Sequence, residues 1–130
     1  MTGQAILIVD DNQANADLLS FLLRKKGYDI RVAGDAHEAL EILRTFSPRL
    51  IMMDLQLPGM DGLALTRKLK ADPATRGIII VALTAYAMKG DDERARDAGC
   101  DAYVSKPINT RTLPGLVAGL LAGGERSEPA

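Results

Sequence analysis

The sequence predicts an α/β protein of the doubly wound type, in which helices cover both faces of a parallel sheet. Two observations lead to this prediction. Five strand-like segments alternate with helix-like segments along the 130 residues, and strict alternation of this kind is typical of right-handed βαβ units. Three of the strand-like segments are continuous apolar runs, as expected of strands that are buried on both faces.

The composition of each strand-like segment predicts its place in the sheet. The three apolar runs are Ala5–Val9, Leu50–Met53 and Ile78–Leu83. The other two segments, Tyr28–Val32 and Ala102–Ser105, alternate apolar and polar residues, which indicates that one face is less well covered. The first, third and fourth strands should therefore be central and the other two should lie at the edges. This arrangement fits a flavodoxin-like, five-stranded parallel sheet in the order 2-1-3-4-5.

Amphipathic patterns predict the first two helices, and one end of each carries a capping residue. Gly27 is suited to close the first helix, because glycine readily adopts the backbone conformation found just after helix ends. Asp35 is suited to cap the start of the second. The residues that we expect on the inward stripes are Ala14, Leu18, Phe21 and Leu22 in the first helix and Ala36, Leu40 and Leu43 in the second.

The third helix is predicted over about 62–71. It should end before Asp72–Pro73, because proline disfavours helix in the residue that precedes it. Leu65 and Leu69 should face inward. The residues expected to face outward are Arg67, Lys68 and Lys70.

The fourth predicted helix has unusually little apolar surface. It spans about 88–98, and beyond Met88 only Ala95 and Ala98 offer inward anchors. A helix held by so few apolar contacts opens locally at low cost in free energy. We therefore expect this helix to move readily.

The fifth helix differs in the opposite way, because the stretch LPGLVAGLLAGG is apolar on all sides. Gly115, Gly119 and Gly123 are four residues apart, which more often indicates a weak helix than a packing motif. The domain is expected to cover residues 4–122, followed by a flexible tail over 123–130.

The composition excludes several classes of function. The chain carries 16 basic and 17 acidic residues, for a formal net charge of −1, without the basic tract typical of nucleic-acid binding. Cys100 is the only cysteine, so no intrachain disulfide can form, and we expect a small buried thiol. His37 is expected to lie on the exposed side of the second helix. Neither a signal peptide nor a membrane-spanning run is apparent, which favours a cytoplasmic protein.

Polar residues follow four of the predicted strands at their carboxyl ends. Asp10 and Asp11 follow the first strand, Asp54 follows the third, Thr84 the fourth and Lys106 the fifth. In a sheet of the predicted order, the carboxyl ends of the first and third strands border the ligand crevice. Clustered carboxylates repel one another unless a cation joins them, and hard oxygen ligands suit Mg²⁺. Carboxylates, a hydroxyl and an ammonium are the groups that phosphoryl transfer needs, with Asp54 as the nucleophile.

Three stretches occur in a specific order: ILIVDDN, LIMMDLQLPGMDG and ALTAYAMKGDDERARDAGCDAYVSKPI. Together they make the chain similar to the response-regulator receiver domains of two-component signalling, over about residues 4–122. The last stretch most resembles stand-alone, DivK-like regulators and the receivers of hybrid histidine kinases. The resemblance implies a phosphoacceptor switch that is no conventional enzyme but catalyses its own phosphorylation and dephosphorylation.

The resemblance also implies a role for each acidic residue. Asp54 would accept a phosphoryl group from a phosphohistidine on a partner. Asp11, Asp54 and the main-chain carbonyl of Gln56 would ligate Mg²⁺ (or Mn²⁺) directly, with Asp10 acting through water. Gln56 and Tyr86 would flank the site and tune the rate of dephosphorylation.

Further residues would respond to the phosphoryl group. Lys106 would contact it, and the peptide bond to Pro107 would be cis. Thr84 would swing to donate a hydrogen bond to a phosphoryl oxygen, and Tyr103 would turn inward behind it. These movements would alter the face formed by the fourth helix, the fifth strand and the fifth helix.

The implied partners are a sensor histidine kinase or histidine phosphotransfer protein and a downstream protein target, with no nucleic acid or membrane. The apolar fifth helix suggests a phosphorylation-sensitive partner or homodimer contact on this face. This expectation requires that some apolar residues of the helix stay exposed in the monomer. It would lose its basis if four residues were all fully buried: Leu116, Val117, Leu120 and Leu121.

Other interpretations stay open at this stage. Asp10 and Asp11 could be a strand end followed by a helix cap. A phosphatase using an aspartyl phosphate is disfavoured because Asp54-Leu55-Gln56 lacks a second acid, and an FMN carrier because DDNQAN would repel a phosphate. A pseudo-receiver would act by binding alone. Little chain follows residue 122, so we expect a single-domain regulator or a receiver excised from a hybrid histidine kinase.

Overall fold

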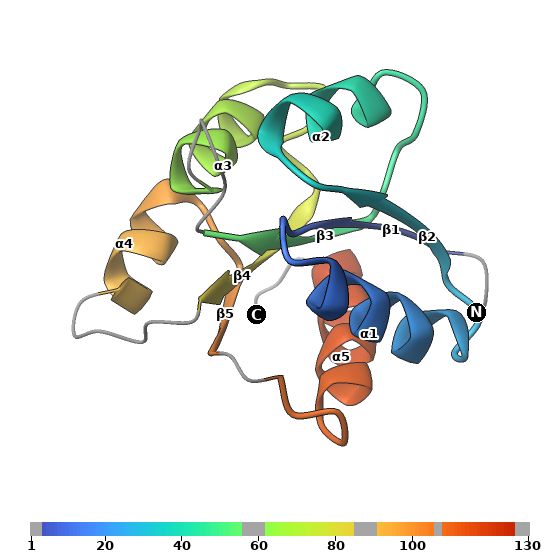
Figure 1. The fold of residues 1–130 in the computed structure, drawn as a ribbon. Helices are drawn as coiled ribbons and strands as arrows, with labels where there is room; N and C mark the ends of the chain where they lie inside the picture. The colour runs from blue at the N-terminus through green and yellow to red at the C-terminus, as the bar shows by residue number, and fades with distance from the viewer. Residues whose placement is uncertain (1–3, 56–61, 85–90, 106–107, 127–130) are drawn as a thin grey trace.

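The computed structural model describes residues 4–55, 62–84, 91–105 and 108–126. Five strands form one parallel sheet, and five helices connect and flank them (Figure 1). The strands are β1 (Ala5–Val9), β2 (Asp29–Ala33), β3 (Leu50–Asp54), β4 (Ile79–Thr84) and β5 (Ala102–Ser105). The helices are α1 (Gln13–Arg24), α2 (Ala36–Leu43), α3 (Gly62–Ala71), α4 (Asp91–Ala98) and α5 (Leu113–Arg126).

The strand order is β2-β1-β3-β4-β5, which confirms the predicted flavodoxin-like topology. The central strands β3 and β4 are buried along their whole length, as their continuous apolar runs predict. The edge strands β2 and β5 are only partly covered. The pattern of apolar and polar residues along each of these strands therefore agrees with how fully the strand is buried.

Helices cover the sheet on both faces, with α1 and α5 on one and α2, α3 and α4 on the other (Figure 1). Alternate residues of the central strands enter two separate hydrophobic cores. The core under α2, α3 and α4 includes Leu7, Val9, Ile51, Met53 and Ile80. The core under α1 and α5 includes Ile6, Ile8, Leu50, Met52 and Val81.

The predicted inward stripe of α1 is wrong. Leu18 is 36% exposed and Phe21 is 61% exposed, and Ala14 is exposed as well. The residues that enter the core are Ala16, Leu19 and Leu23, together with Ser20. Apolar side chains surround much of this helix, so the sequence offers two possible inward stripes, and packing against the sheet buries only one of them. Of the predicted residues, only Leu22 packs against the core, and it is only partly buried.

Both predicted capping residues are confirmed. Gly27 has φ 94°, and its N–H donates to the carbonyl of Arg24 at 2.9 Å, while the N–H of Tyr28 donates to Leu23 at 3.3 Å. This pair of bonds is the Schellman motif, which needs a left-handed residue where Gly27 stands. Asp35 accepts a hydrogen bond from the N–H of Glu38 at 2.8 Å and so caps α2.

The other helix interiors follow their predicted patterns closely. On α2, Ala36 is buried and Leu40 and Leu43 are partly buried against the core, while His37 is exposed as predicted. On α3, Leu65 and Leu69 are buried.

Lys70, predicted to face solvent from α3, is half-buried instead, so this prediction is wrong. Its ammonium donates to the carbonyls of Arg76 and Ile78 and pairs with Asp101 at 3.1 Å. The reason is that its stem packs over Gly99, where an added Cβ would meet the Lys70 Cγ at 2.7 Å. A long lysine side chain can bury its stem while its charge reaches a distant partner.

The last two helices differ as expected. Ala95 and Ala98 of α4 are buried, while Met88 lies outside the described residues. On α5, Val117 and Leu121 are buried, but Leu116 is 38% exposed and Leu120 is only partly buried. The apolar outer face of α5 is therefore partly open.

The helix α5 continues to Arg126, beyond the predicted domain boundary at residue 122. In the part of the chain that the structure describes, no helix is long and apolar enough to cross a membrane.

Candidate functional site

Strand register brings two buried carboxylates together at one edge of the sheet. Val9 of β1 pairs with Met53 of β3, so the next residues along the two strands, Asp10 and Asp54, are neighbours. Each is only 2% exposed. The main chain holds both in place, because the N–H of Asp10 donates to Ala33 and the N–H of Leu55 donates to Leu83 of β4.

Asp11 completes a cluster of three acidic residues. One carboxylate oxygen from each of Asp10, Asp11 and Asp54 lies within 4.8 Å of the others, and Asp11 is exposed while the other two are buried. Three carboxylates this close repel one another, and a divalent cation removes that repulsion. Mg²⁺ favours one or two carboxylates together with water and phosphate oxygens, so the donor set fits this ion.

The alternative reading of Asp10 and Asp11 as a strand end and helix cap is wrong. The N-cap of α1 is Asn12, whose side chain accepts a hydrogen bond from the N–H of Asn15 at 3.1 Å. Asp10 Oδ1 accepts the N–H of Asn12 at 2.9 Å, which turns the chain toward the helix. Asp11 therefore has no capping role at this helix, and its carboxylate lies with those of Asp10 and Asp54 instead.

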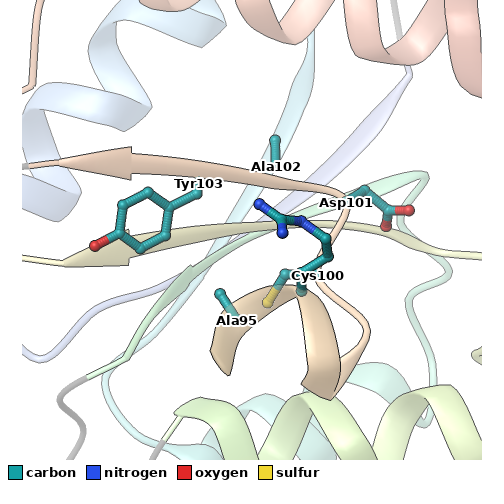
Figure 2. A pocket seen from close by; sticks show the side chains of 6 residues that line it. Ala95, Cys100, Asp101, Ala102 and Tyr103 are labelled. Carbon is teal, nitrogen blue, oxygen red and sulfur yellow. The ribbon is translucent and has the colours of Figure 1, made fainter. Parts of the chain in front are cut away.

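Thr84 and Tyr103 lie on the two strands beyond β3. Thr84 is the last residue of β4 and is buried, next to Ser105 in the register of β5. Tyr103 is partly buried against the core under α2, α3 and α4. It also lines a cavity of about 240 Å³ between the end of α4 and β5, together with Ala95 and Cys100 (Figure 2).

Burial of Cys100 is confirmed, since its exposed fraction is 9%. Burial raises the pKa of the thiol above its usual value, the hydrogen bond with Thr66 lowers it, Asp101 raises it and Lys70 lowers it. The thiol is therefore unlike the low-pKa cysteines that act as nucleophiles.

Four of the predicted site residues lie outside the described residues: Gln56, Tyr86, Lys106 and Pro107. Their predicted roles, and the cis peptide bond before Pro107, stay predictions.

The structure adds a contact that sequence reasoning missed. A Cβ on Gly62 would lie 2.7 Å from the Cα of Leu55 and closer still to the carbonyl oxygen of Asp54. The first residue of α3 thus presses against the main chain of the central carboxylate. In the sequence, the only indication of this contact was a glycine at the start of the predicted third helix. That indication is ambiguous, because glycine also occurs in turns.

Comparison with known proteins agrees with this geometry. The family model for the response regulator receiver domain matches residues 6–118. Two curated relatives, the polar-differentiation response regulators DivK of Brucella anthropi and Brucella ovis, are each 45% identical over 106 residues, covering 82% of this chain and 86% of theirs.

Solved structures show the same fold. A CheY-like receiver domain protein from Methanospirillum hungatei has a TM-score of 0.89 and 31% identity, covering 98% of this chain and 100% of its own. The signal receiver domain of a signal transduction histidine kinase from Syntrophus aciditrophicus has a TM-score of 0.87 and 34% identity, covering 98% and 97%. With the three carboxylates at the strand ends, these matches show that the chain belongs to the response regulator receiver domain family.

Proposed function

We propose that this protein is a phosphoacceptor switch that takes a phosphoryl group onto Asp54 from a histidine kinase or a histidine phosphotransfer protein. The observation that carries the proposal is the cluster of Asp10, Asp11 and Asp54 at the carboxyl ends of β1 and β3. Receiver domains as a family are signalling switches that interact with such kinases and with downstream targets.

In the proposed reaction, a carboxylate oxygen of Asp54 attacks the phosphorus of a phosphohistidine. A new P–O bond forms as the P–N bond breaks, and the imidazole leaves as the neutral ring, keeping the proton that its other nitrogen carries in the phosphohistidine. Asp11, Asp54 and the carbonyl of Gln56 would hold Mg²⁺, with Asp10 acting through water. When bound, this ion would neutralise the negative charge of the carboxylates and the phosphoryl oxygens.

Asp54 and Thr84 are both buried at the ends of neighbouring strands, so Thr84 is close enough to respond to a phosphoryl group on Asp54. Phosphorylation adds negative charge and acceptor oxygens beside β4, where the hydroxyl of Thr84 can donate a hydrogen bond. In this proposal Lys106 contacts the phosphoryl group, and Tyr103 turns inward behind Thr84. Gln56 and Tyr86 set the rate at which the phosphoryl group is lost from Asp54.

The proposed output face comprises α4, β5 and α5. Two features support this assignment: among its described side chains α4 buries only the two alanines Ala95 and Ala98, and Leu116 on α5 is 38% exposed. A weakly held helix can change position at low cost, and exposed apolar side chains can bind a partner or a second copy.

A receiver that belongs to a hybrid histidine kinase is the second candidate. The similarity to the receiver of the Syntrophus histidine kinase supports it. A pseudo-receiver, which binds partners without accepting phosphate, is the outcome if Asp54 proves unreactive.

Intact-mass measurement after incubation with Mg²⁺ and acetyl phosphate tests the proposal. We expect wild type to gain one phosphoryl group, and Asp54→Ala and metal-free wild type to gain none. A known receiver labelled in parallel is the positive control. An unmodified wild-type chain beside a labelled control would contradict the proposal and leave a pseudo-receiver.

A further inference from the structure

The first turn of α3 is pressed against the main chain of Asp54. A Cβ added to Gly62 would clash with the Asp54 carbonyl oxygen and would lie 2.7 Å from the Leu55 Cα and 3.1 Å from the Asp54 carbonyl carbon. All three neighbours are backbone atoms, which have no rotamer by which to give way. The Gly62 N–H also donates to the carbonyl of Leu55 at 3.1 Å.

A buried hydroxyl one turn further along α3 is hydrogen-bonded to this first turn. Thr66 is 0% exposed, and its Oγ1 donates to the carbonyl of Gly62 at 2.8 Å. The same oxygen accepts a weak hydrogen bond from the thiol of Cys100 at 3.9 Å. Cys100 lies at the corner between α4 and β5, so Thr66 links Gly62 to that corner.

From this geometry we infer that Gly62 and Thr66 are positioning residues for Asp54. The inference rests on the proposed function, because it assigns them the task of orienting the phosphoacceptor. Gly62 limits where the Asp54 main chain can lie, and Thr66 limits where Gly62 can lie. In this inference both residues act through the main chain of Asp54 and not by binding the phosphoryl group.

The physical reason is that reactivity depends steeply on the placement of the attacking oxygen. Asp54 ends its strand, so beyond it β3 no longer restrains the chain. Two other contacts restrain the chain at this point. The Leu55 N–H donates to Leu83 of β4 at 2.9 Å, and Gly62 lies against the main chain of Asp54 and Leu55. A misplacement of about 1 Å can cost roughly 100-fold in rate.

The test compares three variants with two matched controls. Gly62→Ala adds the obstructing methyl group, Thr66→Val removes the hydroxyl at nearly constant shape, and Thr66→Ser restores it. Gly119→Ala is the glycine control, since a Cβ there meets nothing within 4 Å. Thr75→Val is the threonine control, since that hydroxyl donates to the Leu69 carbonyl at the other end of α3.

For each variant we would measure the initial rate of phosphorylation by acetyl phosphate, the dissociation constant for Mg²⁺ alone by NMR titration, and the urea midpoint. We expect Gly62→Ala to react about 100-fold more slowly per folded molecule and to bind Mg²⁺ roughly tenfold more weakly. Thr66→Val should react roughly fivefold more slowly, as expected for loss of one buried hydrogen bond. Thr66→Ser and both controls should keep the wild-type phosphorylation rate per folded molecule and the wild-type Mg²⁺ affinity.

A merely structural role predicts a different pattern, in which urea midpoints fall while the rate per folded molecule and the Mg²⁺ affinity stay at wild-type values. That pattern would overturn the inference and leave the proposed function intact. If Gly62→Ala does not fold, the pair Thr66→Val and Thr66→Ser decides the question alone. If wild type itself is not phosphorylated, the proposed function fails, and unchanged Mg²⁺ affinity in Gly62→Ala would overturn the inference as well.

Discussion

The neighbouring helices α3 and α4 cover the same face of the sheet but are held very differently (Figure 1). On α3, Leu65 and Leu69 enter the core, and its first residue packs against the main chain of Asp54. The described side chains of α4 place only Ala95 and Ala98 in the interior. Apolar burial stabilises a helix in proportion to the area removed from water, so α3 is held far more strongly.

This difference suits two tasks within one domain. A phosphoacceptor needs a fixed main chain, which a firmly packed helix provides. An output element needs to change position in response to one added charged group, and a weakly packed helix can do so. Four experiments test whether α3 and α4 differ in this way.

The largest effect is expected from truncating the anchors of the two helices. Leu65→Ala should lower the free energy of unfolding by about 3 kcal/mol, because it removes a fully buried side chain and leaves a cavity. Ala95→Gly in α4 should cost only about 1 kcal/mol, mainly through helix propensity. Urea denaturation measures both. Equal losses would show that α4 is as firmly integrated as α3.

Amide hydrogen exchange of the wild-type protein compares the same helices without mutation. We expect amides in the last turn of α4 to exchange at least about tenfold faster than those around Leu65, because α4 opens locally at lower cost. Amides of β3 provide an internal reference for global unfolding. Similar protection in both helices would count against α4 as the movable element.

A smaller effect is expected where α3 is joined to the corner between α4 and β5. Lys70 at the end of α3 pairs with Asp101, which also accepts the N–H of Ile80 at 2.9 Å. Lys70→Met should lower the free energy of unfolding by about 1 kcal/mol, since the pair is partly screened by solvent. It should also speed amide exchange in α4.

The matched control for that experiment is Arg44→Met, which removes an exposed pair with Glu41 at 3.6 Å. This exposed pair should contribute no measurable stability. A Lys70 variant indistinguishable from the Arg44 variant would show that the junction has no energetic role.

The smallest effect is a pH dependence from Cys100. Burial raises the pKa of this thiol above its usual value near 9. The unfolded chain therefore loses its thiol proton first as pH rises. Below the usual pKa the thiol is protonated in both the folded and the unfolded chain, and the folded state has its full stability. As the pH rises from the usual pKa to the raised pKa, the unfolded chain loses its proton more readily, so the free energy of unfolding falls.

Urea denaturation of wild type and Cys100→Ala between pH 8 and about pH 10 measures this effect. As the pH rises, the free energy of unfolding of wild type should fall relative to that of Cys100→Ala. A pH-independent difference would show that the thiol titrates alike in both states. Slow alkylation of the native thiol is the accompanying expectation.

The sheet and the acidic cluster could be predicted because their signals are local. Continuous apolar runs marked β1, β3 and β4 as central, alternation marked the edges, and the topology rule placed Asp10, Asp11 and Asp54 together. Each inference needs only the residue types along one strand and the regular geometry of parallel sheets.

Other features depended on contacts between distant segments. The stripe of α1 that faces the sheet was mispredicted, because Leu18 and Phe21 are as apolar as the residues that are buried. Lys70 was expected in solvent, because its partner Asp101 lies 31 residues away in the sequence.

The order of the strands and the carboxylates at their ends could thus be inferred from the amino-acid sequence, because periodicity and strand termini are properties of short segments. The packed structure was needed to show which face of α1 is buried, that Lys70 reaches Asp101, and that Gly62 lies against Asp54. Such contacts depend on how whole elements pack against one another. Packing selects among several locally equivalent arrangements by steric fit and hydrogen bonding, and no periodic pattern in the sequence records that choice.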